Sequence, residues 1–340
     1  MIKSVIFPSV IETHNSELSN VSENLINGLK VIHEKEGYLL GDLALTEGIS
    51  PHKNVNSSPD DLDYRLLSKA GLLLSYNDKN EPITLTTGFP FSTYQLFRNQ
   101  AVDLLSNEHI INYDTSTFSG GGKRQLTVRV NKVDVLPEIA GSIIGLRKGD
   151  QQAKGNFFVA SLGYGTFETV LSTEKGIIQR TAISVNGIRY ALNNLIKELN
   201  KNNYLGLKTE HQLDAGLRNG FMILNRRKLD LKPLRKEVLT NYYKDIISPA
   251  LRKAYSDADF EKSQKLYLTG GGALYSEIID CFKDEFDGIL DMEVVDDPQT
   301  LASKGYCYNS LHLNGGDRST AVGIDIGNYQ TVVSTFDDDM

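Results

Sequence analysis

Three glycine-bearing turns, each joined to an apolar and β-rich run, are the feature that most limits what this chain can fold into. Two of them, at 161–166 and 325–331, lie between consecutive strand-like runs and predict β-hairpins. The third, LTGGGAL at 268–274, joins a strand-like run to a helical one. Glycine permits the tight backbone in which successive N–H groups form an anion-binding nest. We therefore expect phosphate-binding turns, with an ordinary hairpin or close strand–helix packing as the alternative for each turn taken singly.

The rest of the chain alternates short β-rich runs with runs of helical period, which predicts an α/β protein of one large or two ordinary domains in 340 residues. Before residue 157 we expect strands at 5–7, 38–40, 83–87, 126–130 and 133–136, a hairpin tip at 116–124, and helices at 62–74 and 94–105 with Asp60 and Ser92 as N-caps. From residue 157 we expect strands at 157–160, 167–171, 177–181, 265–269, 321–326 and 331–336, and helices at 188–199, 235–255, 274–282 and 298–313. The helix at 235–255 follows a polar loop and has an apolar stripe of Val238, Tyr242, Ile246, Pro249 and Leu251.

The composition excludes several classes of protein. With 40% hydrophobic and 23% charged residues the chain is close to the globular average, so wholesale disorder does not fit. The net charge of −7 gives no general electrostatic reason to expect direct nucleic-acid binding. The apolar runs are far shorter than a bilayer span, so we expect no membrane attachment. Two cysteines, Cys281 and Cys307, cannot form a disulfide framework or a four-cysteine zinc site, and we expect a cytoplasmic protein.

The two commonest phosphate-binding signals are missing from the sequence, because no GxxxxGK[ST] loop occurs and no GxGxxG opens a helix. The glycine turns therefore carry the prediction of a nucleotide site. Asp325 stands at the first position of its hairpin, where its carboxylate would face the metal attached to a nucleotide. We expect that contact to run through water, since Mg²⁺ gives up its hydration shell reluctantly.

Taken together, the Asp-x-Gly hairpin, the SLGYGT hairpin and the LTGGGA turn resemble the phosphate 1, phosphate 2 and adenosine motifs of the actin, Hsp70 and sugar-kinase superfamily. The likeness is greatest to bacterial plasmid-segregation ATPases of the ParM type, and IFPSV (6–10), LGD (40–42), TGFP (87–90) and VLPE (135–138) follow in ParM-type order. The resemblance covers nearly the whole chain. It implies an α/β, actin-like (ribonuclease H-like) two-domain fold with ATP, or GTP as the alternative, and Mg²⁺ in the cleft between the domains. The implied nucleotide contacts are Asp325, Gly327, Asn328, Tyr329, Gln330 and Thr331; Ser161, Gly163, Tyr164, Gly165 and Thr166; Gly270, Gly271, Gly272 and Ala273; and Asp214 and Arg218.

The order of these motifs departs from the superfamily pattern, since the phosphate 1 hairpin closes this chain instead of opening it. We therefore expect a circular permutation, in which the polar stretch 314–320 is a flexible joint between the usual ends. The new ends, Ile2 and Phe336, would then lie on neighbouring strands of one sheet. The expected domains are residues 1–148 with 298–340, and residues 149–297.

Individual residues take roles from the resemblance. Glu138 matches the carboxylate that orients or deprotonates the attacking water, with a simple helix N-terminal acid as the alternative. Asp214 and Arg218 match polar ribose and adenine contacts, although a surface ion pair explains them equally well. Two departures concern the metal and the phosphates, because Ser161 stands where relatives have a second Asp near the metal and Val332 where they often have Lys.

One more acidic position, Glu168, also matches the family, with a solvated hairpin face as the alternative explanation for that residue. The resemblance implies that ATP drives filament assembly, that hydrolysis weakens the filaments, and that they separate plasmid copies through a DNA-bound adaptor protein. A small-molecule kinase of the same fold is a rival, which the missing Asp base for a substrate hydroxyl disfavours. A nucleotide-binding scaffold without hydrolysis is a second rival, suggested by Ser161 and Val332.

Overall fold

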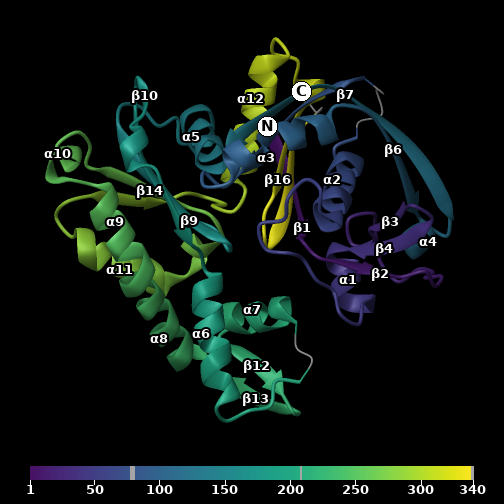
Figure 1. The fold of residues 1–340 in the computed structure, drawn as a ribbon, viewed down its shortest axis with the longest axis horizontal. Coiled ribbons are helices and arrows are strands. Elements are labelled where there is room, and N and C mark those ends of the chain that lie inside the picture. Colours follow the sequence, from purple (N-terminus) through teal and green to yellow (C-terminus); the bar gives the residue numbers. More distant parts are fainter. Residues whose placement is uncertain (77–80, 207–208, 338–340) are drawn as a thin grey trace. The chain divides into compact units, whose positions relative to one another are not determined.

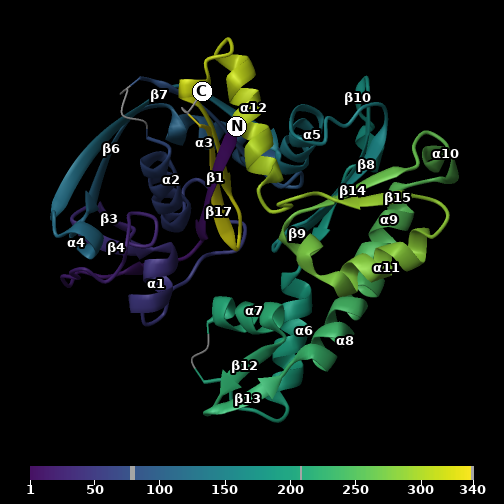
Figure 2. The ribbon, with the colours of Figure 1, turned by 180° about the vertical axis from the view of Figure 1, so that it is seen from behind.

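A computed structural model of the chain describes residues 1–76, 81–206 and 209–337. It divides the chain into two compact units, which we describe separately: unit 1 is Met1–Gln152 with Thr300–Met340, and unit 2 is Ala153–Gln299. Figure 1 and Figure 2 show the ribbons from opposite sides. Within the described ranges, no helix combines the length and the apolar character that crossing a membrane requires.

Unit 1 is built on a nine-stranded sheet in the order β1-β17-β16-β5-β7-β6-β3-β4-β2. Its strands are β1 (Ile2–Pro8), β2 (Ile11–Thr13), β3 (Lys30–His33), β4 (Glu36–Leu40), β5 (Ile83–Phe89), β6 (Asn107–Asp114), β7 (Lys123–Pro137), β16 (Ala321–Ile326) and β17 (Gln330–Phe336). Only the pairs β16–β5 and β5–β7 are parallel. Residue Ile2 pairs with Phe336, so the prediction that the two ends lie on neighbouring strands is confirmed.

The described part of unit 1 also contains six helices, α1 (Gly41–Glu47), α2 (Leu62–Leu74), α3 (Tyr94–Leu105), α4 (Ser116–Ser119), α5 (Glu138–Lys148) and α12 (Leu301–Leu313), together with the 3₁₀ turn η4 (Arg318–Thr320). The apolar side of α2 lies in the main core of this unit with Leu85, Val322 and Ile324. Helices α5 and α12 cross in direct contact, because a side chain at Gly305 would overlap the carbonyl oxygen of Gly141. Of these helices, α2, α3 and α12 lie where the sequence predicts helices, whereas α1, α4 and α5 were not predicted.

Unit 2 has a six-stranded sheet in the order β10-β9-β8-β14-β15, with β11 also paired to β9. Its strands are β8 (Phe157–Leu162), β9 (Thr166–Thr173), β10 (Gly176–Ile177), β11 (Ile183–Asn186), β14 (Lys265–Thr269) and β15 (Asp291–Val294), and β12 (Phe221–Leu224) and β13 (Arg227–Asp230) form a separate ribbon. Its helices are α6 (Arg189–Asn200), α7 (Glu210–Asn219), α8 (Lys232–Tyr242), α9 (Ser248–Ala254), α10 (Asp257–Phe260) and α11 (Ser276–Phe286), with 3₁₀ turns η1 (Gln179–Thr181) and η3 (Gly271–Leu274) and a π-helical turn η2 (Tyr243–Ile247). One core of buried apolar residues joins the sheet to α6, α7, α8, α9 and α11.

The two sheets share a five-strand arrangement. In unit 2 the order is β11-β9-β8-β14-β15, and in unit 1 it is β1-β17-β16-β5-β7. In each case the first two neighbouring pairs are antiparallel and the last two are parallel. In chain order, the hairpin of β8 and β9 comes first in the sheet of unit 2. The matching hairpin of unit 1, β16 and β17, comes last in its sheet. The C-terminal hairpin of unit 1 therefore takes the place that the opening hairpin takes in unit 2.

The helices predicted at 62–74 and 94–105 are confirmed as α2 and α3, but the predicted N-caps Asp60 and Ser92 are wrong. The N-cap residues are the next ones along, Asp61 and Thr93, and neither side chain accepts a hydrogen bond from its helix. The preference of Asp and Ser for N-cap positions therefore located each helix start to within one residue, but it did not identify the capping residue itself.

The strands predicted at 126–130 and 133–136 are one strand, β7. Its pairing with β6 ends at Val130, where its pairing with β5 begins, so hydrogen bonding continues along the whole strand. Of the strand predicted at 177–181, only Ile177 lies in a strand, the short β10. Residues 179–181 form η1, where the Thr181 hydroxyl accepts the Leu171 N–H at 2.9 Å, and the longer strand β11 follows.

The polar gap before the helix predicted at 235–255 is not a loop, since it contains α7 and the β12–β13 ribbon. That helix runs as α8, η2 and α9, and the wider π turn changes which residues face inward. Ile247 is fully buried while Ile246 is only partly buried and Pro249 is exposed, which corrects the predicted stripe. Helices α11 and α12 begin two or three residues later than predicted, at Ser276 and Leu301.

The stretch 314–320, predicted to be a flexible joint, is a hydrogen-bonded turn. The Asn314 carboxamide oxygen accepts from the N–H groups of Gly316 and Asp317, and Asp317 accepts from the Ser319 N–H at the start of η4. Asx-type bonds of this kind explain why a glycine-rich and polar segment takes one defined path.

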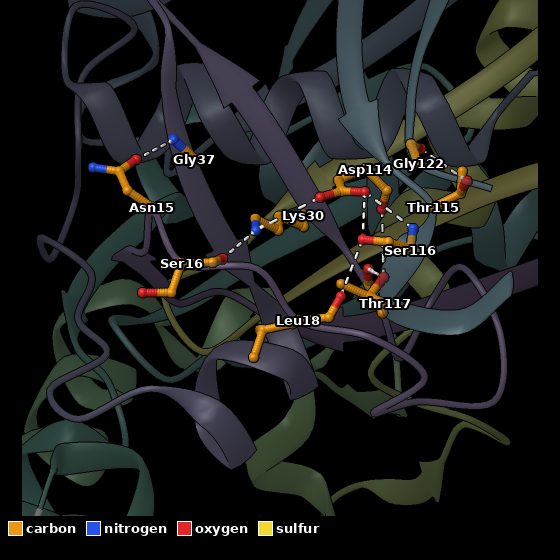
Figure 3. A network of polar contacts seen from close by, with 11 residues as sticks. Asn15, Ser16, Leu18, Lys30, Gly37, Asp114, Thr115, Ser116, Thr117 and Gly122 are labelled. Atoms are coloured by element: carbon orange, nitrogen blue, oxygen red, sulfur yellow. Dashed lines mark hydrogen bonds and ion pairs between the residues drawn. The ribbon is translucent and has the colours of Figure 1, made fainter. Parts of the chain in front are cut away.

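The hairpin tip predicted at 116–124 lies between β6 and β7, and it contains the helical turn α4. A buried network ties this tip to the loop after β2 (Figure 3). Lys30 forms an ion pair with Asp114 at 3.6 Å and donates to the Ser16 carbonyl at 2.8 Å. The Ser116 hydroxyl lies within hydrogen-bonding distance of both the Asp114 carboxylate and the Leu18 carbonyl.

Candidate functional site

The predicted site residues follow the carboxyl ends of the parallel strands in each unit. In unit 1, strands β16, β5 and β7 run parallel, and Asp325 and Glu138 lie at the ends of the first and the last of them. In unit 2, Gly163 follows β8 and Gly270 follows its parallel neighbour β14. Ligands of α/β proteins bind at this edge of a sheet, so the topology brings the predicted residues of each unit to a suitable place.

The two hairpin turns have the same geometry. The Gly327 N–H donates to the Gln330 carbonyl at 3.0 Å, and the Gly163 N–H donates to the Thr166 carbonyl at 2.9 Å. A Cβ atom would lie 2.8 Å from that carbonyl oxygen at Gly327 and 2.7 Å from it at Gly163. Each turn therefore requires glycine at its first position, and the residues two positions earlier, Asp325 and Ser161, are equivalent.

The turn at 163–166 between β8 and β9, which we call the phosphate 2 turn after the motif that it resembles, directs its carbonyl groups toward the start of α6. The carbonyls of Gly163, Tyr164 and Gly165 accept from the N–H groups of Ile188, Arg189 and Gly187, at 3.1, 3.0 and 3.0 Å. In a trans peptide, the C=O of one residue and the N–H of the next point in opposite directions. The N–H groups of Tyr164 and Gly165 are thus aimed away from α6, as in a nest that binds an anion.

The turn at 327–330 between β16 and β17, which we call the phosphate 1 turn after the motif that it resembles, is held by other residues of unit 1. The Ser9 N–H donates to the Tyr329 carbonyl at 2.9 Å, and the hydroxyls of Ser9 and Thr331 lie 2.8 Å apart, with Thr331 fully buried. The Asn328 carboxamide bonds with Asn56. These side chains fix the turn, so its contribution to an anion site would come from the backbone.

Asp325 is the carboxylate of the phosphate 1 hairpin. Burial raises its pKa to about 7. Burial also raises the pKa of Tyr64 on α2, and the charge of Asp325 adds to that shift, so these two groups are neighbours. Among the described residues, no group of three or more His, Cys, Asp or Glu side chains is arranged to hold a metal. A single carboxylate fits Mg²⁺ that is held mainly by phosphate and water, and it does not fit a metal enclosed by protein ligands.

The phosphate 2 hairpin also carries a carboxylate, on its second strand. Glu168 of β9 pairs directly with Ser161 of β8, and only 1% of Glu168 is exposed. The alternative of a solvated hairpin face is therefore wrong, because β9 is flanked by β8 and β11. In unit 1 the matching pair is Asp325 with Val332. Each hairpin thus has one carboxylate at this level, on opposite strands.

The three glycines of the third turn have different surroundings. Gly270 has φ +82°, and a Cβ there would lie 2.7 Å from the Leu162 carbonyl oxygen, while one at Gly272 would lie 2.8 Å from the Leu162 Cβ. Close strand–helix packing therefore explains these two. At Gly271 a Cβ would meet only the Arg218 guanidinium, at 3.7 Å, so this backbone is accessible to a ligand. The Ala273 side chain lies in the core.

Gly271 borders a cavity of about 150 Å³, lined by Arg218, Arg235, Gly271, Leu274, Tyr275, Ser276 and Glu277. Asp214 supports this cavity, because its Oδ2 accepts from Arg218 Nε at 2.7 Å. Asp214 is fully buried, so the two residues are not a surface ion pair. Its other oxygen, Oδ1, has no hydrogen-bond partner among the described residues. Such an acceptor is costly to leave unsatisfied inside a protein.

Glu138 is the first residue of α5 and is partly exposed. Its position after β7 places it at the same edge of the unit 1 sheet as Asp325, since β16, β5 and β7 are parallel. A carboxylate in the first turn of a helix also interacts favourably with the helix dipole. The catalytic role and the simple structural role of Glu138 both remain consistent with this position.

Sequence reasoning missed the residues that hold the turns in place. Ser9 and Asn56 fix the phosphate 1 turn, and Glu210 and Arg189 contact Tyr164 of the phosphate 2 turn. Ser9 lies in the IFPSV stretch of the family resemblance, but no local pattern links it to the turn, and none marks Asn56, Arg189 or Glu210.

Comparison with known proteins agrees with this architecture. Residues 2–141 match the family described as actin like proteins N terminal domain. This chain has the actin-like fold. The structure of a pCBH ParM non-polymerisable quadruple mutant is 18% identical, with a TM-score of 0.72 over 92% of this chain and 93% of that one. A 15-stranded ParM filament from Clostridium botulinum gives 18% identity and a TM-score of 0.73 over 91% and 93%.

An archaeal actin homologue, Ta0583, in complex with ADP is 14% identical, with a TM-score of 0.68 over 92% of this chain and 93% of that one. No curated protein matches the sequence. The prediction of an actin-like α/β fold similar to ParM is therefore confirmed.

Proposed function

We propose that this actin-like protein binds ATP with Mg²⁺, assembles into filaments with ATP bound, and hydrolyses the nucleotide. The observation that carries the proposal is the repeated hairpin geometry, in which Gly163 and Gly327 make the same turn at the carboxyl ends of parallel strands. Two proteins of the same fold support the proposal. Ta0583 was solved in complex with ADP, which supports nucleotide binding, and ParM was solved as a filament, which supports self-association.

The proposed roles follow from the surroundings of each group. Backbone N–H groups at 164–165 and 328–329 would bind the phosphates, since those of Gly163 and Gly327 donate within their own turns. Asp325 would hold hydrated Mg²⁺, which supplies charge neutralisation at the phosphates when bound. The backbone of Gly271 would face the nucleoside, with Arg218 and its buried partner Asp214 beside it. Glu138 would orient the attacking water as the catalytic carboxylate.

We also propose that the chain is a circular permutation of the superfamily order, with domains at 1–148 plus 298–340 and at 149–297. The support is internal, because the hairpin of β16 and β17 takes the place in unit 1 that β8 and β9 take in unit 2. A cytoplasmic role in plasmid segregation, through a DNA-bound adaptor protein, completes the proposal.

The test combines light scattering with phosphate release on the purified full chain. We expect scattering to rise on addition of ATP and Mg²⁺, with phosphate release following, and neither signal with ADP; GTP in parallel tests the base. Nucleotide binding without phosphate release would favour a non-hydrolysing scaffold. Turnover without any rise in scattering would contradict filament formation, and no binding of either nucleotide would refute the proposal as a whole.

A further inference from the structure

The side chain that follows the hairpin glycine is anchored in both units. In unit 1, Asn328 accepts from the Asn56 N–H at 2.7 Å and donates from Nδ2 to Asn56 Oδ1 at 3.0 Å. In unit 2, Tyr164 has the equivalent position, and its hydroxyl donates to Glu210 Oε1 at 2.8 Å. Both side chains thus attach their turn to another segment of the same unit.

The Tyr164 contact is part of a closed set of bonds among three elements. Glu210 is the first residue of α7, and its carboxylate also forms an ion pair with Arg189 at the start of α6. The Arg189 N–H donates to the Tyr164 carbonyl at 3.0 Å, so the same arginine contacts both partners. Figure 1 shows α6 and α7 side by side in unit 2. The phosphate 2 turn, α6 and α7 are therefore fixed to one another.

The protonation states of this pair suit a lasting hydrogen bond. Burial and the neighbouring Glu210 carboxylate raise the pKa of Tyr164 far above its ordinary value, so its hydroxyl keeps the proton. Burial opposes ionisation of Glu210, but the hydrogen bonds from Arg189 and Tyr164 outweigh it and lower the pKa of Glu210. At neutral pH the hydroxyl is therefore a donor and the carboxylate an acceptor.

Helix α7 carries the residues that we assign to the nucleoside. Asp214 and Arg218 follow Glu210 at intervals of four, and residues at that spacing lie on one face of a helix. The Asp214 charge also contributes to the raised pKa of Tyr164, so the tyrosine is close to both acids. A bond from Tyr164 to Glu210 thus sets the position of Asp214 and Arg218 relative to the phosphate 2 turn.

We propose that Tyr164 is a positioning residue, whose hydroxyl fixes α7 against the phosphate 2 turn so that one nucleotide contacts both. This inference rests on the proposed nucleotide function. A ligand that joins two subsites gains affinity when the distance between the subsites is fixed, whereas a fragment that occupies one subsite gains nothing from it.

The experiment uses Tyr164→Phe, which removes only the hydroxyl. Dissociation constants are measured in the full chain for ATP directly, and for adenosine and tripolyphosphate by competition with ATP. We expect ATP to bind about tenfold more weakly, the scale of one hydrogen bond to a charged group, while each fragment changes less than about twofold. Tyr190→Phe is the matched control, since Tyr190 on α6 donates to Asp245 at 3.3 Å and contacts neither turn nor α7 through that bond.

A second pair of variants keeps the test decisive if Tyr164→Phe does not fold. Glu210→Gln retains an oxygen acceptor for the tyrosine and should bind ATP more tightly than Glu210→Ala, while adenosine binds both variants alike. Unchanged ATP affinity in Tyr164→Phe would overturn the inference, as would equal weakening of ATP and both fragments or equal ATP affinity of the two Glu210 variants. A parent protein that binds no nucleotide would instead refute the proposed function itself.

Discussion

The buried ion pair of Lys30 and Asp114 allows a quantitative test of how unit 1 is held together (Figure 3). The two side chains are 6% and 8% exposed, and their charged atoms lie 3.6 Å apart. Asp114→Asn removes the negative charge but keeps an oxygen that accepts from Ser116. The variant therefore leaves a buried ammonium group without its counter-ion and changes little else.

Breaking a buried ion pair by removing one partner typically destabilises a protein by about 3 to 5 kcal/mol. In a unit of this size, each kcal/mol lowers the melting temperature by about 2 to 4 °C, so we expect a fall of roughly 6 to 20 °C. Lys30→Met combined with Asp114→Asn should recover most of the loss, because no uncompensated charge then remains. Thermal melts of the parent, both single variants and the double variant, followed by circular dichroism, measure the coupling.

The pH dependence gives an independent check. Burial alone would raise the pKa of Asp114, but hydrogen bonds from Ser116 and the charge of Lys30 hold it below its ordinary value. A lowered pKa in the folded state contributes stability above the unfolded-state pKa of about 4, and this contribution is lost as the pH falls through the folded-state value. The gap in melting temperature between the parent and Asp114→Asn should therefore be constant near neutral pH and narrow below about pH 4. A single variant within 2 °C of the parent, or a double variant no better than Asp114→Asn, would refute the reasoning.

The remaining predictions concern the site and the topology. Gly271→Val should weaken ATP binding at least about tenfold at an unchanged melting temperature, because its side chain enters the open cavity. Gly270→Ala should instead lower the melting temperature, because Gly270 has a positive φ and a Cβ there would meet Leu162. Isothermal titration measures the first effect and melting curves measure the second. Glu138→Gln should slow phosphate release by roughly two to four orders of magnitude at nearly constant ATP affinity, and equal turnover would remove it from the site. Deleting 321–336 removes β16 and β17 with their buried apolar side chains, each of which contributes about 2 to 5 kcal/mol, so cooperative melting of unit 1 should disappear. A chain reordered to begin at Gly316, with residue 337 joined to Met1 by a short turn, should melt like the parent, because Ile2 and Phe336 are already paired.

The elements that the sequence predicted well are those whose identity depends on nearby residues. Helices α2 and α3 and strands β14 and β16 have a clear apolar period over their whole length, and their predicted bounds agree with the structure. The elements that were missed depend on partners far along the chain. Strand β11 has only four residues and forms because β9 offers it an edge, and α7 lies in a polar stretch whose inward face only the folded core defines.

In the candidate site, too, the sequence predicts residues with a local role and misses residues that act through distant contacts. The glycines of the turns could be predicted, since a tight turn with an N–H bond to the carbonyl three residues on excludes a side chain there. The residues that anchor these turns could not, because Asn56 and Glu210 have no feature of their own that distinguishes them from other surface-type residues. Their role comes from tertiary contacts, which a linear pattern does not contain.

The register of the two hairpins bears on whether the protein hydrolyses nucleotide. A sequence motif contains only residues that follow one another along the chain. Ser161 stands where relatives have an acid, and this difference suggested a nucleotide-binding scaffold without hydrolysis. In the sheet, however, the position beside Ser161 on the neighbouring strand is Glu168, and that carboxylate is buried at the same level as Asp325 in the other hairpin. The phosphate 2 hairpin therefore has a carboxylate on the strand next to Ser161. Under the proposed function, Glu168 would supply the carboxylate that Ser161 lacks, and Val332 would cost one lysine contact to phosphate without removing the groups that we assign to the reaction.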